Sequence, residues 1–279
     1  MLKKKESELN CFRLTQEYIN RRASLQVKKY LHTLLPWCDN HLPVLQSERP
    51  DFIINAIGCS YAVEHFLIDF CNDGVNNNQS KSQIENRKVS DLFGKYHDSK
   101  IGTIKDSDLE PATADIEEEL NRLANISSSF DYDRFIDSFF RVFDNHYKRI
   151  DEYRLNKEFE SENIKIGFLI ELHCDTCLMH ASWNNTVVSF RGGHKAFPMT
   201  RDIIEKFKSA EKMDYIVLSQ FNEGVFVEAS DVRVFDPHNI DDSLEKQRIR
   251  VYDRVFYPNV NKHIKLNLTT SSTDDTHNE

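Results

Sequence analysis

The chain has 279 residues, a net charge of -9 and 39% hydrophobic residues, with only 8 glycines and 7 prolines. This composition excludes fibrous and low-complexity proteins and indicates one elaborated, packed domain. No stretch approaches the roughly 18 consecutive apolar residues that a membrane span requires. The charged first residues do not resemble a secretory signal, and the six scattered cysteines favour reduced thiols, so we expect a cytoplasmic protein.

Charge is distributed unevenly along the chain. Residues 1–50 carry nine basic and five acidic residues, a balance of +4, whereas residues 98–133 carry three basic and ten acidic residues, a balance of -7. Affinity for nucleic acid depends largely on cationic contacts to phosphates. Because much of the acidity lies in one segment, the negative net charge does not exclude a nucleic-acid partner.

The first predicted elements are a helix and two strands. Apolar residues recur at helical spacing from Thr15 to Leu35, and Pro36 ends the pattern. A short β-rich run from Asp51 to Ile54 precedes a turn-like segment, Asn55 to Ser60, and a second β-rich run from Tyr61 to Asp69. The local order is therefore a helix followed by a β-hairpin.

The middle of the chain contains a polar segment and two predicted helices. Residues 71–108 are rich in Asn, Ser, Asp and Lys and predict a long loop, and Asp115 to Ile126 predicts a short acidic helix. A stronger amphipathic helix is predicted from Asp131 to Lys157. Its apolar face consists of Phe135, Phe139, Val142, Phe143, Ile150 and Tyr153.

The second half alternates strands with a helix. Strands are predicted at Ile164 to Leu172, Thr186 to Arg191, Met213 to Leu218 and Gly224 to Glu228, and a helix at Thr200 to Lys212. This alternation predicts an α/β fold with a sheet between helices. The last residues, 269–279, are polar and predict a disordered tail.

Two acidic residues are placed on the predicted hairpin. Asp51 begins its first strand, and Glu64 lies in the apolar second strand beside Val63 and Phe66. A buried carboxylate is costly unless it is paired or binds a metal. Two such groups supply hard oxygen ligands suited to Mg²⁺ or Mn²⁺, which can activate water for attack on a phosphodiester. Asp51 could instead simply begin a strand after the turn at Pro50.

The hairpin resembles the PD-(D/E)XK nuclease superfamily, in which a Pro-Asp pair precedes a hairpin and a Glu-x-Lys triplet lies on its second strand. Pro50-Asp51 and Glu64-His65-Phe66 match those positions. The resemblance covers most of residues 15–70 and 160–230. It implies a restriction-endonuclease-like mixed sheet flanked by helices, with a helical and loop insertion.

One position departs from the family pattern: Phe66 stands where the family has its lysine. Helical spacing puts His146 and Arg149 on or beside the apolar face of the predicted helix, whereas Lys148 points away. His146 and Arg149 are therefore the candidate replacements, although Arg149 would stay protonated and could not act as a base. Both could equally form a polar seam between helices.

Further residues compete for functional roles. Glu171 closes an apolar strand and is a candidate third metal ligand, whereas His65 should face away from Glu64. Cys174 and Cys177 lie between two histidines and could hold zinc, or could simply lie in a loop. The basic turn Arg191 to Lys195 and the helix cations could contact phosphates or be solvated. These helix cations are Arg21, Arg22, Lys28 and Lys29.

The resemblance divides the chain into four parts. Residues 1–70 form the N-terminal helix and first hairpin of the nuclease-like core, 71–160 an acidic loop and helical insertion, 161–262 the rest of the core sheet, and 263–279 the tail.

We expect a metal-dependent nuclease that acts on DNA, with Asp51 and Glu64 as Mg²⁺ or Mn²⁺ ligands, in restriction, phage defence or mobile-element biology. The alternative is an inactive nucleic-acid or protein-binding module on the same fold. A homodimer or a partner protein is compatible with either, and no membrane partner is expected.

Overall fold

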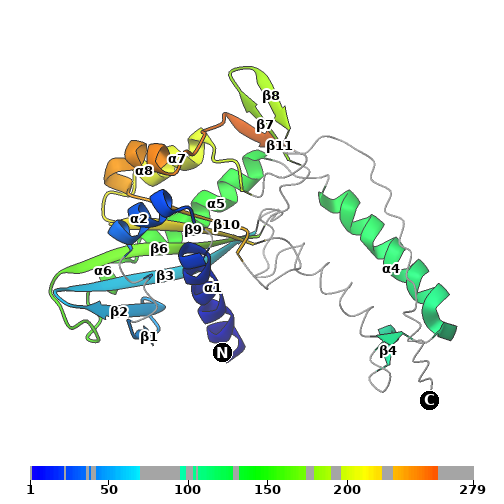
Figure 1. Ribbon diagram of the computed structural model, residues 1–279, viewed down its shortest axis with the longest axis horizontal. Coiled ribbons are helices and arrows are strands. Elements are labelled where there is room, and N and C mark those ends of the chain that lie inside the picture. Colours follow the sequence, from blue (N-terminus) through cyan, green and yellow to red (C-terminus); the bar gives the residue numbers. More distant parts are fainter. Residues whose placement is uncertain are drawn as a thin grey trace, which may run out of the picture. The chain divides into compact units, whose positions relative to one another are not determined.

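The computed structural model describes residues 2–21, 23–35, 38, 42–69, 95–98, 103–104, 106–127, 132–173, 179–189, 196–221 and 229–256. The fold is α/β, with a mixed six-stranded sheet in the order β1-β2-β3-β6-β9-β10 (Figure 1). The strands are β1 (Val44–Gln46), β2 (Phe52–Ala56), β3 (Cys59–Asp69), β6 (Ile164–His173), β9 (Tyr215–Phe221) and β10 (Asp231–Phe235). Strands β3, β6 and β9 run parallel to one another, and the remaining pairs are antiparallel.

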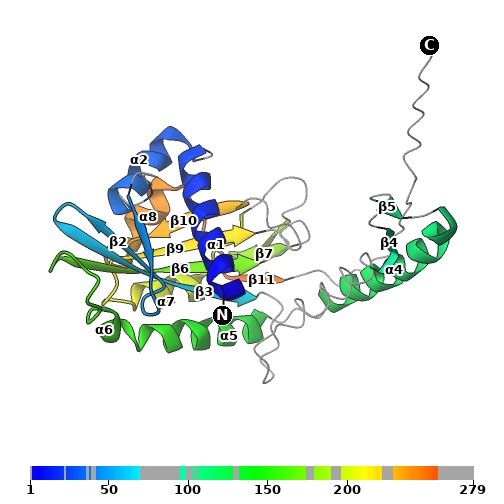
Figure 2. The ribbon, with the colours of Figure 1, turned by 90° about the horizontal axis from the view of Figure 1, so that it is seen from below.

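Helices cover both faces of this sheet (Figure 2). Helices α1 (Leu2–Arg21) and α2 (Leu25–Leu34) lie on one face, and α5 (Tyr132–Tyr147) and α7 (Arg201–Lys208) lie on the other. On the α1 face, the Phe12 ring lies 4.7 Å from the Phe52 ring. We call the two sides the α1 face and the α5 face.

Phenylalanine side chains fill the space between the sheet and helices α5 and α7. Phe143 packs against Phe168 of β6 at 5.2 Å between ring centroids and against Phe207 of α7 at 5.9 Å. All three rings are almost fully buried. Each buried ring contributes roughly 1.5–3 kcal/mol of hydrophobic stabilisation, so this layer fixes α5 firmly over β3 and β6.

The two long helices predicted from periodicity are each broken. The helix predicted from Asp131 to Lys157 ends at Tyr147, and a single turn, α6 (Ile150–Tyr153), follows after Arg149. The helix predicted from Thr15 to Leu35 is likewise two helices, because Ser24 caps the start of α2 with its hydroxyl. The helical spacing of apolar residues continues across both breaks, so the sequence pattern predicted one continuous helix in each case.

The predicted hairpin is confirmed, although β2 begins one residue after Asp51. Its turn contains Gly58 at a φ of +76°, a conformation that glycine adopts readily. The predicted strands at Ile164 and Met213 are β6 and β9, and the helix predicted from Thr200 to Lys212 is the shorter α7. The predicted strand from Gly224 to Glu228 lies outside the described residues.

A second sheet of three strands has the order β11-β7-β8. It consists of β7 (His180–Trp183), β8 (Thr186–Ser189) and β11 (Arg254–Phe256). Asn184 and Asn185 form the β7–β8 turn with positive φ angles of 46° and 61°. Between β10 and β11 the chain forms a short 3₁₀ turn, η3 (Pro237–Asn239), and α8 (Ile240–Lys246).

The chain divides into two compact units. Met1–Gly74 and Asp131–Pro258 form the unit that contains the six-stranded sheet, and Val75–Phe130 and Asn259–Glu279 form the other. The insertion therefore ends near residue 130 rather than at residue 160, because α5 packs on the sheet. The predicted loop at 71–108 and tail at 263–279 fall largely or wholly outside the described residues.

The second unit contains one helix and a short hairpin among its described residues. Helix α4 (Asp106–Ser127) includes the predicted acidic helix but begins earlier, and Pro111 lies inside it. Strands β4 (His97–Asp98) and β5 (Thr103–Ile104) pair with each other.

Candidate functional site

Asp51 and Glu64 lie side by side on the α5 face of the sheet. Phe52 pairs with Val63 across the β2–β3 hairpin, and both belong to the core on the α1 face. Because side chains alternate along a strand, the preceding Asp51 and the following Glu64 face the other way. Asp51 Oδ2 accepts a hydrogen bond from the His65 backbone N–H at 2.8 Å, which fixes the Asp51 carboxylate at this position.

The surroundings of Asp51 disfavour its charged form. Burial first, and then the negative charge of Glu64, raise the pKa of Asp51 to about 7. The charge of Glu8, a buried residue of α1, acts in the same direction. Asp51 and Glu64 therefore form a pair of like-charged carboxylates, and Glu8 adds only a weaker electrostatic effect from α1.

Glu64 has one satisfied oxygen and one unsatisfied oxygen. Its Oε1 lies 2.9 Å from His146 Nδ1, and its side chain is only 8% exposed. Its Oε2 is buried and has no hydrogen-bond partner. An unpaired buried polar group costs about 1–3 kcal/mol, so this oxygen is suited to an additional ligand. A divalent cation between Glu64 Oε2 and Asp51 fits this donor set, since both ligands are hard oxygens.

Phe66, the residue at the lysine position of the family motif, holds His146 in place. Its ring stacks on the His146 imidazole with 4.5 Å between centroids and 14° between planes. His146 lies in the last turn of α5 and its side chain is 23% exposed, so solvent reaches the imidazole. His146, one of the two candidate replacements for the missing lysine, thus lies within hydrogen-bond distance of Glu64.

Arg149 and Tyr153 lie at the border of the same cluster. Arg149 is exposed and caps α6, whereas Tyr153 is fully buried. Burial first, and then the charge of Glu64 and the approach of the Tyr153 hydroxyl to that carboxylate, raise the pKa of Tyr153, while the positive charge of Arg149 lowers it. Arg149 is therefore close enough to influence the cluster electrostatically, although it makes no described contact with Asp51 or Glu64.

Glu171, the third expected metal ligand, does not join this pair. It lies beside Leu67 in the β3–β6 register and so shares the α1 face with His65. Its Oε2 lies 2.7 Å from His65 Nε2 and its Oε1 lies 2.5 Å from His173 Nε2. Burial opposes ionisation of Glu171, but the hydrogen bonds from His173 and His65 outweigh it and lower the pKa of Glu171 to about 2. Glu171 is thus a satisfied core carboxylate.

Cys11 completes this second cluster. The donor atoms of Cys11, His65 and Glu171 all lie within 4.8 Å of one another, and by type they could hold a soft metal ion. Burial raises the pKa of the Cys11 thiol, which disfavours the thiolate that such an ion needs. Both oxygens of Glu171 are already hydrogen-bonded, so this cluster needs no metal to satisfy its carboxylate. Glu64, in contrast, has one buried oxygen without a hydrogen-bond partner.

Of the remaining sequence candidates, Arg21 and Lys28 are described and lie away from the Asp51–Glu64 pair. Cys174, Cys177 and the turn from Arg191 to Lys195 lie outside the described residues. Arg21 forms an ion pair with Glu17, and Lys28 donates to the Asn20 carbonyl oxygen at 3.1 Å. Both cations lie near the C-terminal end of α1, whereas Glu8 lies near its beginning, so they are distant from the carboxylates.

Comparison with known proteins gives no relative. No protein-family model, no curated protein sequence and no solved structure matches the chain. Among the described residues, no helix is both long and apolar enough to cross a membrane. What the molecule does must therefore be argued from the geometry of its side chains.

Proposed function

We propose that the protein is a metal-dependent phosphodiesterase that acts on DNA, with its centre at Asp51 and Glu64. One observation carries the proposal: Glu64 Oε2 is buried and unpartnered beside a second carboxylate whose pKa is raised to about 7. Carboxylates that repel each other in a partly dry site are stabilised by a shared divalent cation. Mg²⁺ or Mn²⁺ suits an all-oxygen donor set.

The order of elements supports assignment to the PD-(D/E)XK nuclease superfamily. Helix α1 is followed by the β1-β2-β3 antiparallel strands, then by α5, and β6 returns parallel to β3. This order is compatible with the mixed sheet flanked by helices that the sequence resemblance implies. The two motif carboxylates also face the same side of the hairpin, as a shared ligand requires.

Each residue of the cluster has a distinct proposed role. Asp51 and Glu64 hold the cation, which would supply positive charge at the scissile phosphate. His146 donates to Glu64 through Nδ1, so in the neutral imidazole Nε2 is free of a proton and can accept one from an attacking water. Arg149 contributes a permanent positive charge at the rim of the site and takes no part in proton transfer.

Phe66 favours the second candidate function, an inactive binding module on the same fold. The side chain that would place a cation beside the metal water is replaced by a buried aromatic ring. If the His146 imidazole does not compensate for it, the protein would bind nucleic acid or a protein without cleaving a phosphodiester.

Cleavage assays with purified full-length protein separate the two candidates. We expect cleavage of single- or double-stranded DNA with Mn²⁺ or Mg²⁺, no cleavage with a chelator, and loss of cleavage in Glu64→Gln. His146→Gln should reduce the rate by about 10²–10⁴-fold, as for loss of a general base.

His238→Gln, which alters an exposed histidine of η3, is the matched control and should cleave normally. Cleavage that persists unchanged in Glu64→Gln would refute the proposed site. DNA binding without cleavage under any divalent cation would favour the inactive module.

A further inference from the structure

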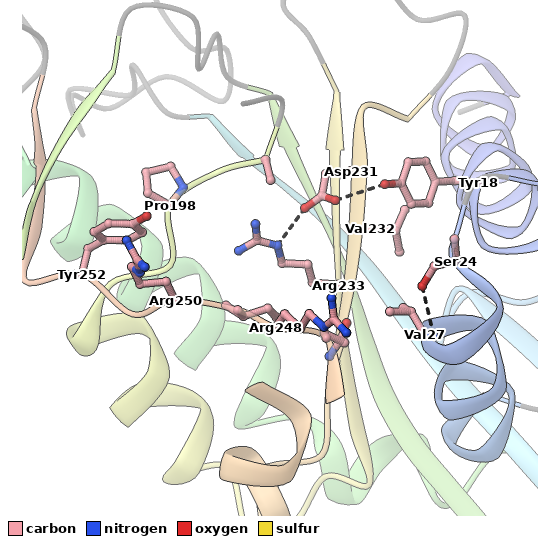
Figure 3. A pocket seen from close by; sticks show the side chains of 14 residues that line it. Tyr18, Ser24, Val27, Pro198, Asp231, Val232, Arg233, Arg248, Arg250 and Tyr252 are labelled. Atoms are coloured by element: carbon pink, nitrogen blue, oxygen red, sulfur yellow. Dashed lines mark hydrogen bonds and ion pairs between the residues drawn. The ribbon is translucent and has the colours of Figure 1, made fainter. Parts of the chain in front are cut away.

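A pocket of about 490 Å³ opens beyond the end of α1, far along that helix from Glu8 (Figure 3). It lies between the first residues of β10, the start of α2 and the segment that follows α8. Glu8 and the pocket residue Tyr18 are ten residues apart on α1, which corresponds to about 15 Å along the helix axis. The pocket is thus separate from the Asp51–Glu64 pair.

The charges of the pocket are predominantly positive. Among the described residues, its lining includes the guanidinium groups of Arg233, Arg248 and Arg250 and one carboxylate, that of Asp231. Three positive charges and one negative charge leave a balance of +2 in a concave surface. A cavity lined by one sign of charge concentrates the opposite charge, so the pocket attracts anions.

Arg233 is held in a fixed orientation. Its Nε lies 2.7 Å from Asp231 Oδ2, and the Tyr18 hydroxyl donates to Asp231 Oδ1 at 3.2 Å (Figure 3). The Arg233 side chain is only 16% exposed. This arrangement engages Nε and leaves the outer edge of the guanidinium group available to a ligand. A planar, pre-oriented guanidinium is the group that proteins use for bidentate recognition of phosphate.

Arg248 adopts a backbone conformation that glycine normally takes. Its φ is 54°, and it follows α8 at the position where helices commonly end on glycine. The Arg248 N–H donates to the Glu245 carbonyl oxygen, and the Ile249 N–H donates to that of Leu244. An arginine at such a position is unfavourable for the backbone, which indicates that its side chain serves another purpose.

Arg248 and Arg250 have no acidic partner among the described residues. Arg248 lines the pocket with an exposed side chain, and Arg250 lies 5.0 Å from the centre of the Trp183 ring. An arginine that is not neutralised by a carboxylate keeps its full attraction for an anion. Together with Arg233, these residues supply cations from two separate chain segments.

We propose that this pocket binds a small phosphorylated ligand of nucleotide size, with its phosphate group on Arg233 and Arg248. The volume lies within the roughly 300–1,000 Å³ of small-molecule sites. The aromatic rings of Tyr18 and Tyr252 and the apolar side chains of Val27 and Pro198 line the same cavity and suit a base and sugar. This inference does not depend on the proposed phosphodiesterase.

Adenosine monophosphate serves as the probe, measured by calorimetric titration of the full chain in the presence of a chelator. We expect binding with one site per chain, competition by inorganic phosphate, and affinity for adenosine that is weaker by about tenfold or more. Without a divalent cation, binding at the carboxylate pair is disfavoured, and Glu64→Gln should bind the probe as the wild type does.

Arg248→Gly is the decisive variant. It removes one guanidinium group while placing the preferred residue at a positive φ, so thermal stability should stay equal or rise while affinity falls by about tenfold or more. Arg141→Gln, which removes an exposed cation from α5, is the matched control and should bind normally. Unchanged affinity in Arg248→Gly, equal affinity for adenosine, or no binding at millimolar probe would overturn the proposal.

Discussion

Asp51 and Glu171 are carboxylates of the same sheet whose pKa values shift in opposite directions. The pKa of Asp51 is raised to about 7, above the value of about 3.9 that an aspartate has in an unfolded chain. Its contribution to stability is therefore fully present below pH about 4 and is lost as pH rises through 7. A divalent cation bound by Asp51, as we propose, would offset this cost.

Asp51→Asn should remove this cost. The free energy of unfolding of the variant, relative to the wild type, should increase by about 1–3 kcal/mol between pH 4 and pH 8, because no buried carboxyl has to ionise. Urea unfolding across that range, with a chelator present, measures the difference. A difference that does not change with pH would contradict the raised pKa of Asp51.

Glu171 should behave in the opposite way. Its pKa is lowered to about 2, so its stabilising contribution is present above pH about 4.3 and is lost as pH falls towards 2. Glu171→Gln leaves His65 and His173 without their carboxylate and should lower the free energy of unfolding at pH 7 by about 3–5 kcal/mol. Acid titration of unfolding should then show a shallower loss of stability than in the wild type.

At the scale of elements, the sequence predicted the hairpin, the phenylalanine-faced helix and the strands that became β6 and β9. Each has a strong local signal, such as Gly58 in the turn or the repeated phenylalanines of α5. The sequence could not predict which face of the sheet the Glu171 side chain occupies, because this depends on the register between β3 and β6. Pairing with Leu67 rather than a neighbour decides which face Glu171 occupies.

Gly167 shows how close packing supports the hairpin. A Cβ atom at this position of β6 would lie 2.1 Å from the Tyr215 ring, whose hydroxyl donates to the Ala62 carbonyl oxygen at 3.0 Å. Gly167→Ala should therefore destabilise the protein by about 1–3 kcal/mol through overpacking. Thermal unfolding measures this effect, and an unchanged midpoint would mean that the Tyr215 ring moves freely.

At the scale of the whole molecule, the acidic insertion was predicted but its end was misplaced. The sequence boundary at residue 160 followed the change from helix to strand, whereas the structural boundary near residue 130 follows packing on the sheet. The pocket at Arg233 was not predicted at all. Its cations lie on β10 and on the segment after α8, and they meet only because the chain folds back through η3 and α8, so no local spacing marks them.

The central claim is that the functional carboxylates are those on the α5 face. Mn²⁺ titration of the full chain, followed by the loss of the free-ion electron paramagnetic resonance signal, tests it directly. The account predicts one bound Mn²⁺ per chain in the wild type and in Cys11→Ala, with binding lost in Glu64→Gln. Binding that is retained in Glu64→Gln but lost in Cys11→Ala would place the ion on the α1 face and contradict the account.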